Sequence, residues 1–285
     1  MATKTAPAPE GLGITERDFQ TIRQLVYDNF GINLTDQKRS LVVGRLQKVL
    51  RQRSFPDFPT YLQWLTSDRS GEGLEELANR ISTNHTFFWR ENSHFNHFAK
   101  TALPELVARK RKEGGGKLRI WCAGCSSGEE PYTLAMLMQE VLGADHDRLS
   151  PVLLATDISQ VALRTAMAAV YADERLQQMP RDLMRKYLRK GPQPGTWQIA
   201  EEIRRRVIFR RHNLMNATFP FKNAFDAVFC RNVMIYFDRP TRDALIERFH
   251  RHTVPGGYLY IGHSETLGRD GALYDYVLPA AYRRK

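Results

Sequence analysis

Residues 118–137, LRIWCAGCSSGEEPYTLAML, join a short apolar run, a glycine-rich turn and a second apolar run. The first run is typical of a strand buried on both faces, and the second has the length of a helix. Gly124 and Gly128 bound the turn between them. This segment restricts the fold strongly, because a strand that passes through a tight turn directly into a helix opens a parallel sheet whose strands are joined by helices.

The same alternation continues toward the C-terminal region. We expect strands at residues 118–124, 152–158, 206–214, 225–237 and 258–264, and helices at 130–143, 159–171 and 241–252. Strands that alternate with helices predict an α/β fold with a parallel sheet and helices on both faces. Residues 171–206 interrupt the alternation, because turn residues there separate two possible strands. We expect an inserted helix and β-hairpin in this stretch.

The first 85 residues have a different pattern. Apolar side chains at helical spacing predict a helix over residues 15–30, with Thr15 as its N-cap and Gly31 at its end. Further helices are expected at residues 36–53, 55–65 and 73–82. The predicted organisation is a flexible tail at 1–13, a small all-helical domain at 14–85 and an α/β domain at 86–285 that carries the insertion at about 171–206.

Cysteine usage and hydropathy indicate the cellular compartment in which the protein is expected. Three cysteines in 285 residues are too few for a disulfide framework, and no apolar run approaches the ~20 residues of a membrane span. The first residues also lack the apolar core of a signal peptide. We expect a cytoplasmic, reduced protein without direct membrane insertion. Its net charge of +11 is compatible with an anionic partner but does not identify one, because many soluble proteins are basic.

Cys122 and Cys125 form a Cys-x-x-Cys pair, a spacing found in redox and zinc sites. A redox pair starts a helix, whereas Cys122 is expected in a strand and Cys125 in the following loop. Structural zinc takes four ligands, and Cys230 stands alone in another expected strand. His94 and His97 are three positions apart but have no further ligand set beside them. We therefore expect no metal site.

The glycine loop instead favours a nucleoside with a cationic end. Its Gly124-x-x-x-Gly128 spacing differs from the dinucleotide pattern, and Glu129 and Glu130 stand where a pyrophosphate needs free N–H groups. Two carboxylates at this point suit a positive charge. Asp157, at the end of the second expected strand, is typical of an acidic residue that binds ribose hydroxyls. Together these residues predict a Rossmann-like fold that binds S-adenosylmethionine, a nucleoside that carries a positive charge.

Six segments, taken in order along the chain, resemble the chemotaxis receptor glutamate O-methyltransferases, the CheR family. They are ISTNHTFFWRE (81–91), WCAGCSSGEEPYTLAM (121–136), LLATDIS (153–159), NLM (213–215), FDAVFCRNVMIYFD (225–238) and PGGYLYIGHSE (255–265). The resemblance implies a Rossmann-like S-adenosylmethionine-dependent methyltransferase fold with a small all-helical N-terminal domain and an inserted β-hairpin subdomain. It also implies methyl transfer to glutamate side chains in the cytoplasmic signalling helices of chemoreceptors, with S-adenosylhomocysteine as the product.

The resemblance assigns roles to individual residues. Cofactor contacts are implied for Asn84, Thr86, Arg90, Glu129, Asp157, Asn213, Leu214, Arg231 and Asn232. Arg90 and Tyr236 match the residues nearest the transferred methyl group and are the expected catalytic residues. In some family members the inserted subdomain grips a peptide at the receptor's C-terminus. Its tip here, GPQPGTW (191–197), carries two prolines, and the resemblance does not extend to this tip.

The helix expected at residues 36–53 has many cations on one side. These are Lys38, Arg39, Arg45, Lys48, Arg51 and Arg53, whereas its apolar side would carry Leu41, Val42, Leu46, Val49 and Leu50. Such a charged side is either solvated surface or a docking surface for the acidic helical bundle of a chemoreceptor.

Two other functions are compatible with the same fold. A nucleic-acid methyltransferase would share the cofactor and the basic charge. One family of base-modifying enzymes in that class has an acidic or amide residue followed by two prolines where this chain reads RNVMIYF (231–237), so no nucleic-acid partner is expected. A signalling adaptor that binds the cofactor without turnover is the second alternative.

Overall fold

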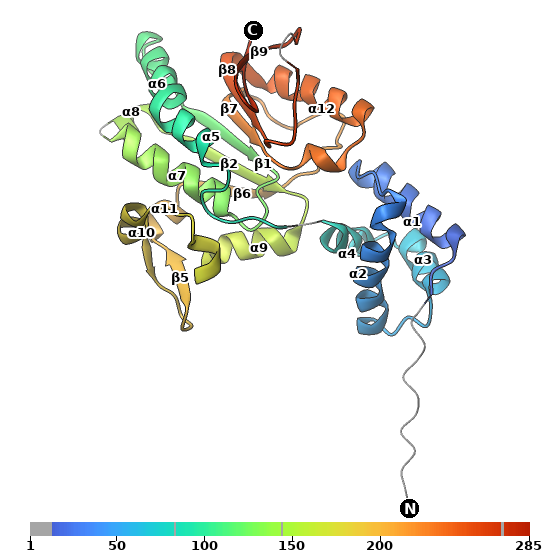
Figure 1. Ribbon diagram of the computed structural model, residues 1–285. Helices are drawn as coiled ribbons and strands as arrows, with labels where there is room; N and C mark the ends of the chain where they lie inside the picture. Colours follow the sequence, from blue (N-terminus) through green and yellow to red (C-terminus); the bar gives the residue numbers. More distant parts are fainter. Residues whose placement is uncertain (1–12, 83, 144, 269–270) are drawn as a thin grey trace, which may run out of the picture. The chain divides into compact units, whose positions relative to one another are not determined.

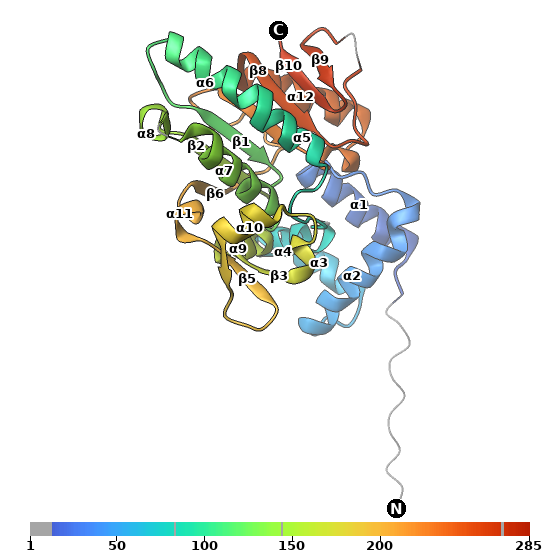
Figure 2. The ribbon, with the colours of Figure 1, turned by 60° about the vertical axis from the view of Figure 1, so that its left-hand side comes forward.

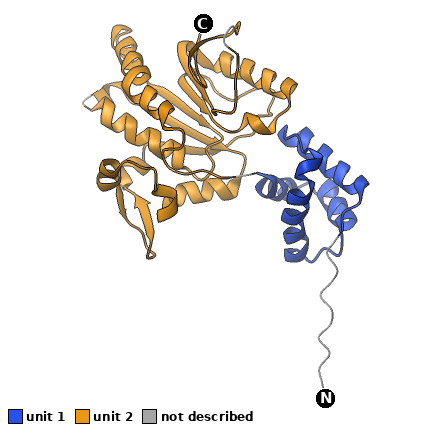
Figure 3. Ribbon diagram, viewed as in Figure 1, with its two compact units in different colours: residues 1–83 blue, residues 84–285 orange. Residues whose placement is uncertain are grey.

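The computed structural model describes residues 13–82, 84–143, 145–268 and 271–285. It divides the chain into two compact units, residues 1–83 and 84–285, which Figure 3 distinguishes by colour. The tail predicted for residues 1–13 lies outside the described residues except for Gly13. The first unit is helical, and both described sheets belong to the second unit.

The first unit is built from helices that bury their apolar sides. Its elements are α1 (Glu16–Phe30), the 3₁₀ turn η1 (Asp36–Lys38), α2 (Arg39–Gln52), α3 (Phe58–Ser67) and α4 (Glu72–Ile81). The stripe predicted for α1 is buried and consists of Phe19, Ile22, Val26 and Phe30. The hydroxyl of Thr15 accepts a 3.1 Å hydrogen bond from the amide of Asp18, and Gly31 ends the helix with φ 68°. Both predicted ends of α1 are confirmed.

The second helix differs from its prediction at two points. It begins three residues late as an α-helix, because η1 occupies residues 36–38. Leu41, predicted on the apolar side, is 50% exposed, so that prediction was wrong. Lys48 lies seven positions after Leu41. Because an α-helix has 3.6 residues per turn, both residues lie on the same side of the helix, and Lys48 is exposed. The buried side is narrower than predicted and consists of Val42, Leu46, Val49 and Leu50.

The six cations at residues 38–53 do not form one free face. Within the unit, Arg39 pairs with Glu16, Arg53 pairs with Glu72 and Glu76, and Arg45 donates to the carbonyls of Arg80, Ile81 and Ser82. Arg45 therefore caps the carboxyl end of α4, where cations are favourable. Lys48 and Arg51 are exposed and lie three positions apart, on the same side of α2.

The second unit is an α/β domain around a seven-stranded sheet, which Figure 1 shows in green to red. Its strands are β1 (Arg119–Ala123), β2 (Val152–Asp157), β6 (Val207–Arg211), β7 (Phe225–Cys230), β8 (Thr253–Ile261), β9 (Tyr274–Leu278) and β10 (Ala281–Arg284). The strand order is β6-β2-β1-β7-β8-β10-β9. The first five strands in this order are parallel, whereas β10 is antiparallel to both of its neighbours.

Helices cover both faces of this sheet. They are α5 (Asn92–His97), the π-helical turn η2 (Phe98–Ala102), α6 (Leu103–Lys112), α7 (Glu129–Leu142), α8 (Asp145–Leu149), α9 (Gln160–Ala168) and α12 (Arg239–His252). Ile120 and Cys122 of β1 face the core that contains α6 and α7, whereas Trp121 and Ala123 face the core that contains α12. Figure 1 shows α7 and α12 on opposite sides of the strands. Burial on both faces explains why β1 reads as a continuous apolar run.

The predicted insertion forms a small separate sheet. It contains β3 (Val170–Ala172), η3 (Asp173–Leu176), α10 (Arg181–Tyr187), β4 (Leu188–Lys190), β5 (Thr196–Ile199) and α11 (Glu201–Arg204), most of which are labelled in Figure 2. β4 and β5 form the predicted antiparallel hairpin, and β3 pairs with the other edge of β5. The hairpin is therefore confirmed. The helix predicted at 159–171 ends at Ala168, and the additional strand β3 starts where the prediction continued the helix.

A further prediction needs correction, and two strands were missed. The strand expected at 225–237 ends at Cys230, and a 3₁₀ turn, η4 (Met234–Tyr236), follows it. The strands β9 and β10 were not predicted at all. Within the described part of the chain, no helix combines the length and apolarity that crossing a membrane requires.

Candidate active site

Most residues with predicted roles lie at the carboxyl ends of the parallel strands of the large sheet. The glycine loop follows β1, Asp157 ends β2, Asn213 lies two residues after β6, and Arg231 directly follows β7. These four strands are neighbours, and their parallel direction brings their carboxyl ends to the same edge. The strand order reverses between β1 and β7, and ligands of open α/β sheets bind at such a reversal.

The glycine loop is fixed to β2 and packed against its surroundings. The amide of Gly124 donates a 2.8 Å hydrogen bond to the carbonyl of Thr156. Gly124 has φ 85°, and a side chain there would overlap Val233. Gly128 has φ 99°, and a Cβ there would lie 2.8 Å from the hydroxyl of Tyr171. Both positions therefore require glycine for backbone conformation and for close approach.

Asp157 joins the loop to the end of β2. Its Oδ2 accepts a 2.8 Å hydrogen bond from the amide of Ser126, and its Oδ1 accepts one of the same length from the amide of Ser159. Burial raises the pKa of Asp157, and these amide donors oppose that rise. A carboxylate has about four acceptor sites, so Asp157 keeps acceptor capacity for ligand hydroxyls.

Glu129 is a buried carboxylate at the first position of α7. The hydroxyl of Ser127 donates to both of its oxygens, at 3.0 and 2.8 Å. Burial raises the pKa of Glu129, while its position at a helix N-terminus favours the anion. Arg175 of the inserted subdomain lies 3.4 Å from its Oε1 and also donates to the carbonyl of Thr86. No local pattern indicated Arg175, because 46 positions separate it from Glu129.

The segment before α5 supplies the remaining predicted residues. Asn84, Thr86 and Arg90 are all partly buried. The guanidinium of Arg90 donates a 3.0 Å hydrogen bond to the carbonyl of His85 and lies 6.0 Å from the ring centre of Phe87. Arg90 thus folds back on its own segment, while 29% of its side chain stays exposed. This exposed part can meet a ligand or a substrate.

Asn213 and Leu214 follow the edge strand β6. The carbonyl oxygen of the Asn213 side chain accepts a 3.0 Å hydrogen bond from the amide of Met215, which makes a local turn. Leu214 is buried in the core on the α12 side of the sheet. The preceding residue, His212, donates its amide to the carbonyl of Asp157 at 3.0 Å. Cofactor contact by Asn213 and Leu214 stays a prediction.

Arg231 connects three parts of the domain. Only 3% of its side chain is exposed. Its Nη1 donates to Glu130 at 2.8 Å, and its Nη2 donates to Glu91 at 3.2 Å and to the carbonyl of Arg90. The guanidinium also lies over the ring of Phe95 at 4.8 Å. Its charge is therefore shared between two carboxylates. Its buried side chain connects the segments that carry Glu130, Glu91 and Arg90.

Asn232 and Tyr236 lie in the turn after β7. Asn232 has φ 58°, and its side-chain amide donates to Glu91 at 3.1 Å. Tyr236 ends η4, and its amide donates to the carbonyl of Val233 at 3.2 Å. The Tyr236 side chain is partly buried. The turn that carries Tyr236 is thus tied to the segment that carries Arg90, although about 140 positions separate them.

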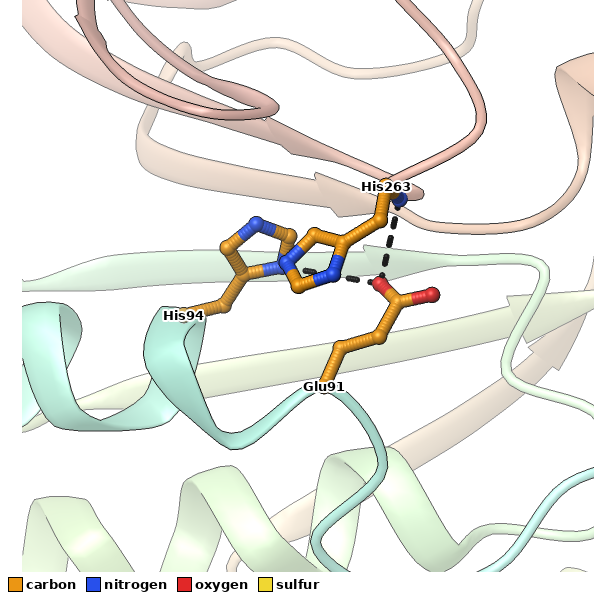
Figure 4. Close-up of side chains that lie close together, drawn as sticks. All are labelled: Glu91, His94 and His263. Carbon is orange, nitrogen blue, oxygen red and sulfur yellow. Dashed lines mark hydrogen bonds and ion pairs between the residues drawn. The ribbon is translucent and has the colours of Figure 1, made fainter.

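One group of three described residues has donor atoms at metal-ligand spacing. One ligand atom each of Glu91, His94 and His263 lies within 4.8 Å of the others (Figure 4). The Glu91 carboxylate, however, already accepts hydrogen bonds from Arg231 and from the amide of His263. A metal cation would share this carboxylate with the guanidinium charge, and the repulsion opposes binding. We interpret the group as part of the hydrogen-bond network around Arg231.

The cysteine pair is chemically inert in this environment. Cys122, Cys125 and Cys230 are free thiols and are buried. Burial raises the pKa of each thiol well above its usual value of 9.0, so the reactive thiolate is disfavoured. The thiol of Cys122 donates to Glu130 at 3.0 Å. This geometry supports the exclusion of a redox pair.

The donor set fits a nucleoside that carries a cationic amino-acid group better than a dinucleotide. Asp157 offers acceptors for ribose hydroxyls at the end of β2. Glu129 occupies the first turn of α7, where a pyrophosphate would otherwise bind, and its carboxylate suits an ammonium or sulfonium group. S-adenosylmethionine carries the hydroxyls and both cationic groups.

Comparison with known families covers almost the whole described chain. Residues 84–278 match the family model described as "CheR methyltransferase, SAM binding domain". Residues 17–82 match the model described as "CheR methyltransferase, all-alpha domain". The two matched ranges fall within the two compact units of the structure.

Individual relatives extend over most of the chain. A "Chemotaxis protein methyltransferase" of Borreliella burgdorferi is 40% identical over 96% of this chain and 96% of its own length. "Chemotaxis protein methyltransferase 2" of Pseudomonas aeruginosa is 38% identical over 89% of this chain and 88% of its own. The Escherichia coli "Chemotaxis protein methyltransferase" is 36% identical, with coverages of 90% and 87%.

Proposed function

The chain belongs to the CheR family of S-adenosylmethionine-binding methyltransferases, and from this membership we propose that it esterifies glutamate side chains of chemoreceptors. Methylation in chemotaxis is the function that its relatives' names give. The finer proposal is that the acceptor is a carboxylate oxygen and the product a glutamyl methyl ester. The observation that carries it is the joint presence of the family's cofactor domain and an active-site turn without a recognisable catalytic base.

Glutamate needs no activation by the protein. Its reference pKa of about 4.3 means that it is already an anion at neutral pH. S-adenosylmethionine, when bound, supplies an electrophilic methyl group on a sulfonium. The chain's task is then to bind, align and exclude water, because a cation and an anion combine into neutral products.

Arg90 and Tyr236 are the residues that we assign to the substrate carboxylate. Arg90 keeps 29% of its side chain exposed, although its guanidinium is oriented by His85. Tyr236 closes a short turn that Glu91 and Arg231 connect to the Arg90 segment. We propose that Arg90 orients the incoming carboxylate and that the Tyr236 hydroxyl donates a hydrogen bond to it. An arginine that bound the anion too tightly would also stabilise the ground state, so its contribution should be mainly orientation.

The receptor's helical bundle is the proposed partner, and the exposed side of α2 is its proposed docking surface. Lys48 and Arg51 are the cations of that side, and both are exposed. Arg45 is excluded from the surface, because it donates to the carbonyls at the end of α4. Complementary charge would steer the encounter with an acidic bundle. This partner also places the chain in the cytoplasm, where the signalling helices of chemoreceptors lie.

The two alternatives predict different products. A nucleic-acid methyltransferase would transfer the methyl group to RNA or DNA, and a cofactor-binding adaptor would bind without turnover. Incubation with methyl-labelled S-adenosylmethionine and cytoplasmic receptor fragments, followed by mild alkali, separates these cases. A glutamyl ester releases the label as methanol, whereas an N-methyl group is stable to base. Base-stable label on the protein, label on nucleic acid, or no transfer would reject the proposal.

A further inference from the structure

Asn232 is held by two carboxylates from distant parts of the domain. Its backbone amide donates to Glu265 at 3.2 Å, and its side-chain amide donates to Glu91 at 3.1 Å. Glu91 lies before α5, and Glu265 lies after β8. A residue fixed through both its backbone and its side chain has little freedom to rotate.

Glu265 collects backbone amides from both sides of this residue. Its Oε1 accepts a 2.9 Å hydrogen bond from Ile235, and its Oε2 accepts one of 2.5 Å from Gly262. Glu265 is 6% exposed. Burial raises the pKa of Glu265, and the amide donors oppose that rise. One buried anion thus fixes the start of the turn at Asn232 and the residue that precedes Tyr236.

Glu91 supplies the second anchor. Besides Asn232, it accepts hydrogen bonds from Arg231 at 3.2 Å and from the amide of His263 at 3.3 Å, and the latter is drawn in Figure 4. His263 follows Gly262, which donates to Glu265. Two consecutive amides after β8 therefore bind the two different carboxylates. Three segments meet at this point: the end of β8, the segment before α5 and the turn after β7.

Backbone conformation at this junction is also unusual. Asn232 at φ 58°, Glu91 at φ 54° and Trp89 at φ 68° all adopt the left-handed region without being glycine. Such residues cost free energy, and they persist where the surroundings determine the conformation, as at functional sites. A Cβ on Gly262 would lie 2.5 Å from the Asn232 side-chain nitrogen and 2.9 Å from Glu265. The junction therefore has no room for a methyl group.

We propose that Glu265 and Glu91 are positioning residues for methyl transfer, which hold the turn of residues 231–236 so that Tyr236 meets the acceptor carboxylate in line with the methyl group. The effect on the reaction rests on the proposed function. The effect on the turn does not, because it follows from the hydrogen bonds alone. Neither carboxylate touches the reacting atoms in this role. Their action is to remove the rotational freedom of the turn before substrate binds.

The principal test uses Glu265→Gln, which keeps the size of the side chain but removes the charge and offers an N–H group to the amide donors. We expect kcat for receptor methylation to fall about 10²-fold, the scale of a misplacement of about 1 Å. Affinity for S-adenosylhomocysteine should change by less than about threefold, well under one tenfold step. Deuterium exchange of the amides in residues 231–236 should accelerate in the product complex, while exchange in β1 and β2 stays unchanged.

A second variant perturbs the junction without changing charge. Gly262→Ala adds a methyl group where only 2.5 to 2.9 Å is free, so it should reproduce the loss of kcat and the faster exchange. Glu105→Gln is the matched control, since Glu105 on α6 accepts a hydrogen bond from Tyr258 and pairs with Arg283, outside the junction. It should turn over and exchange like the parent.

Three results would overturn the proposal. The first is a parent-like kcat in both Glu265→Gln and Gly262→Ala. The second is unchanged exchange of residues 231–236 in both variants. The third is a loss of product affinity as large as the loss of kcat, which would make the junction a support of the cofactor pocket alone. If the parent itself formed no ester, the proposed function would fail, and the exchange experiment would still decide whether Glu265 holds the turn.

Discussion

The backbone amide of Ser126 donates a 2.8 Å hydrogen bond to Oδ2 of Asp157, so the glycine loop after β1 is tied directly to the end of β2. The same carboxylate is the predicted ligand of the cofactor ribose. One residue therefore shapes the loop and is also predicted to contact the ligand. A simple loss of affinity on substitution would not separate these two roles.

We expect Asp157→Ala to weaken binding of S-adenosylmethionine and S-adenosylhomocysteine by roughly 10- to 150-fold, since hydrogen bonds to a charged group are worth about 1.5–3 kcal/mol. Titration calorimetry measures this loss. An S-adenosylhomocysteine analogue with hydrogens in place of the ribose hydroxyls separates the roles. The parent should bind the analogue more weakly than it binds S-adenosylhomocysteine. In Asp157→Ala the affinities for the two ligands should be equal. A difference of equal size in both proteins would reject the ribose contact. Asp182→Ala, at an exposed position of α10, serves as the control.

The exposed side of α2 leads to a second prediction. Reversing Lys48 and Arg51 to Glu should raise the KM for receptor by roughly tenfold, since exposed charge pairs are each worth about 0.2–1 kcal/mol and reversal adds repulsion. Affinity for S-adenosylhomocysteine should not change. The parent's advantage should shrink with salt, because the Debye length falls from ~10 Å at 0.1 M to ~3 Å at 1 M.

A matched control exists in the same helical unit. Arg17 and Arg69 are exposed, and reversing both changes the net charge by the same amount without touching α2. If this control raised the KM as much as Lys48→Glu/Arg51→Glu, the effect would come from total charge and not from a docking surface. Arg45 should be left intact, because its loss would free the carbonyls at the end of α4.

Local sequence signals were sufficient for the elements that carry the cofactor site. The strand β1, the glycine loop and α7 were predicted because their apolar runs and turn glycines lie within one short segment. Asp157 was placed correctly at the end of β2, because the end of a strand is where apolar residues give way to polar ones. The prediction of Leu41 as a core residue was wrong, because an apolar residue next to Val42 lies 100° away from it around the helix.

Long-range partners were not predictable in the same way. Glu91 meets Asn232 across 141 positions, and Arg231 meets Glu130 across 101. No spacing rule connects such residues, since the fold alone brings them together. The strands β9 and β10 were missed for a related reason. β9 reads YDYVL and β10 reads AYRR, so these strands of five and four residues lack the strict alternation of apolar and polar residues that identifies a strand.

His94 should make stability depend on pH. Burial lowers its pKa to about 4, and the charge of Arg231 acts in the same direction. The unfolded chain, with a histidine pKa near 6.5, binds a proton that the folded chain excludes between about pH 6.5 and pH 4. The stability linked to neutral His94 is therefore present above pH 6.5 and is lost as the pH falls. At pH 5 the loss relative to pH 7 should be about 2 kcal/mol.

Urea unfolding of the parent and of His94→Gln at pH 7 and pH 5 measures this contribution. Nε2 of His94 lies 3.1 Å from the carbonyl oxygen of Pro279. Glutamine places an N–H donor near the same position but does not titrate. The parent should lose about 2 kcal/mol more than His94→Gln between the two pH values. His85→Gln, at an exposed position, should show the parent's pH dependence. Equal losses in the parent and His94→Gln would show that folding does not lower the pKa of His94.

Tyr236 provides the test that separates chemistry from binding. Because the acceptor carboxylate is ionised without help, a hydroxyl beside it acts by orientation and by electrostatics in the transition state. Tyr236→Phe keeps the partly buried ring and the 3₁₀ turn, whose hydrogen bond comes from the backbone amide. We expect the variant to fold like the parent, to bind S-adenosylhomocysteine nearly as well, and to lose on the order of 10²–10³ in kcat.

Single-turnover methyl transfer at saturating cofactor and receptor measures this rate without product release. Tyr276→Phe, on the exposed strand β9, is the control for removal of a tyrosine hydroxyl and should turn over like the parent. Arg90→Ala should lose both kcat and some cofactor affinity, because its segment also carries Asn84 and Thr86. A parent-like rate in Tyr236→Phe would assign Tyr236 to packing. The carboxylate would then have to be aligned by Arg90 and the backbone of the turn.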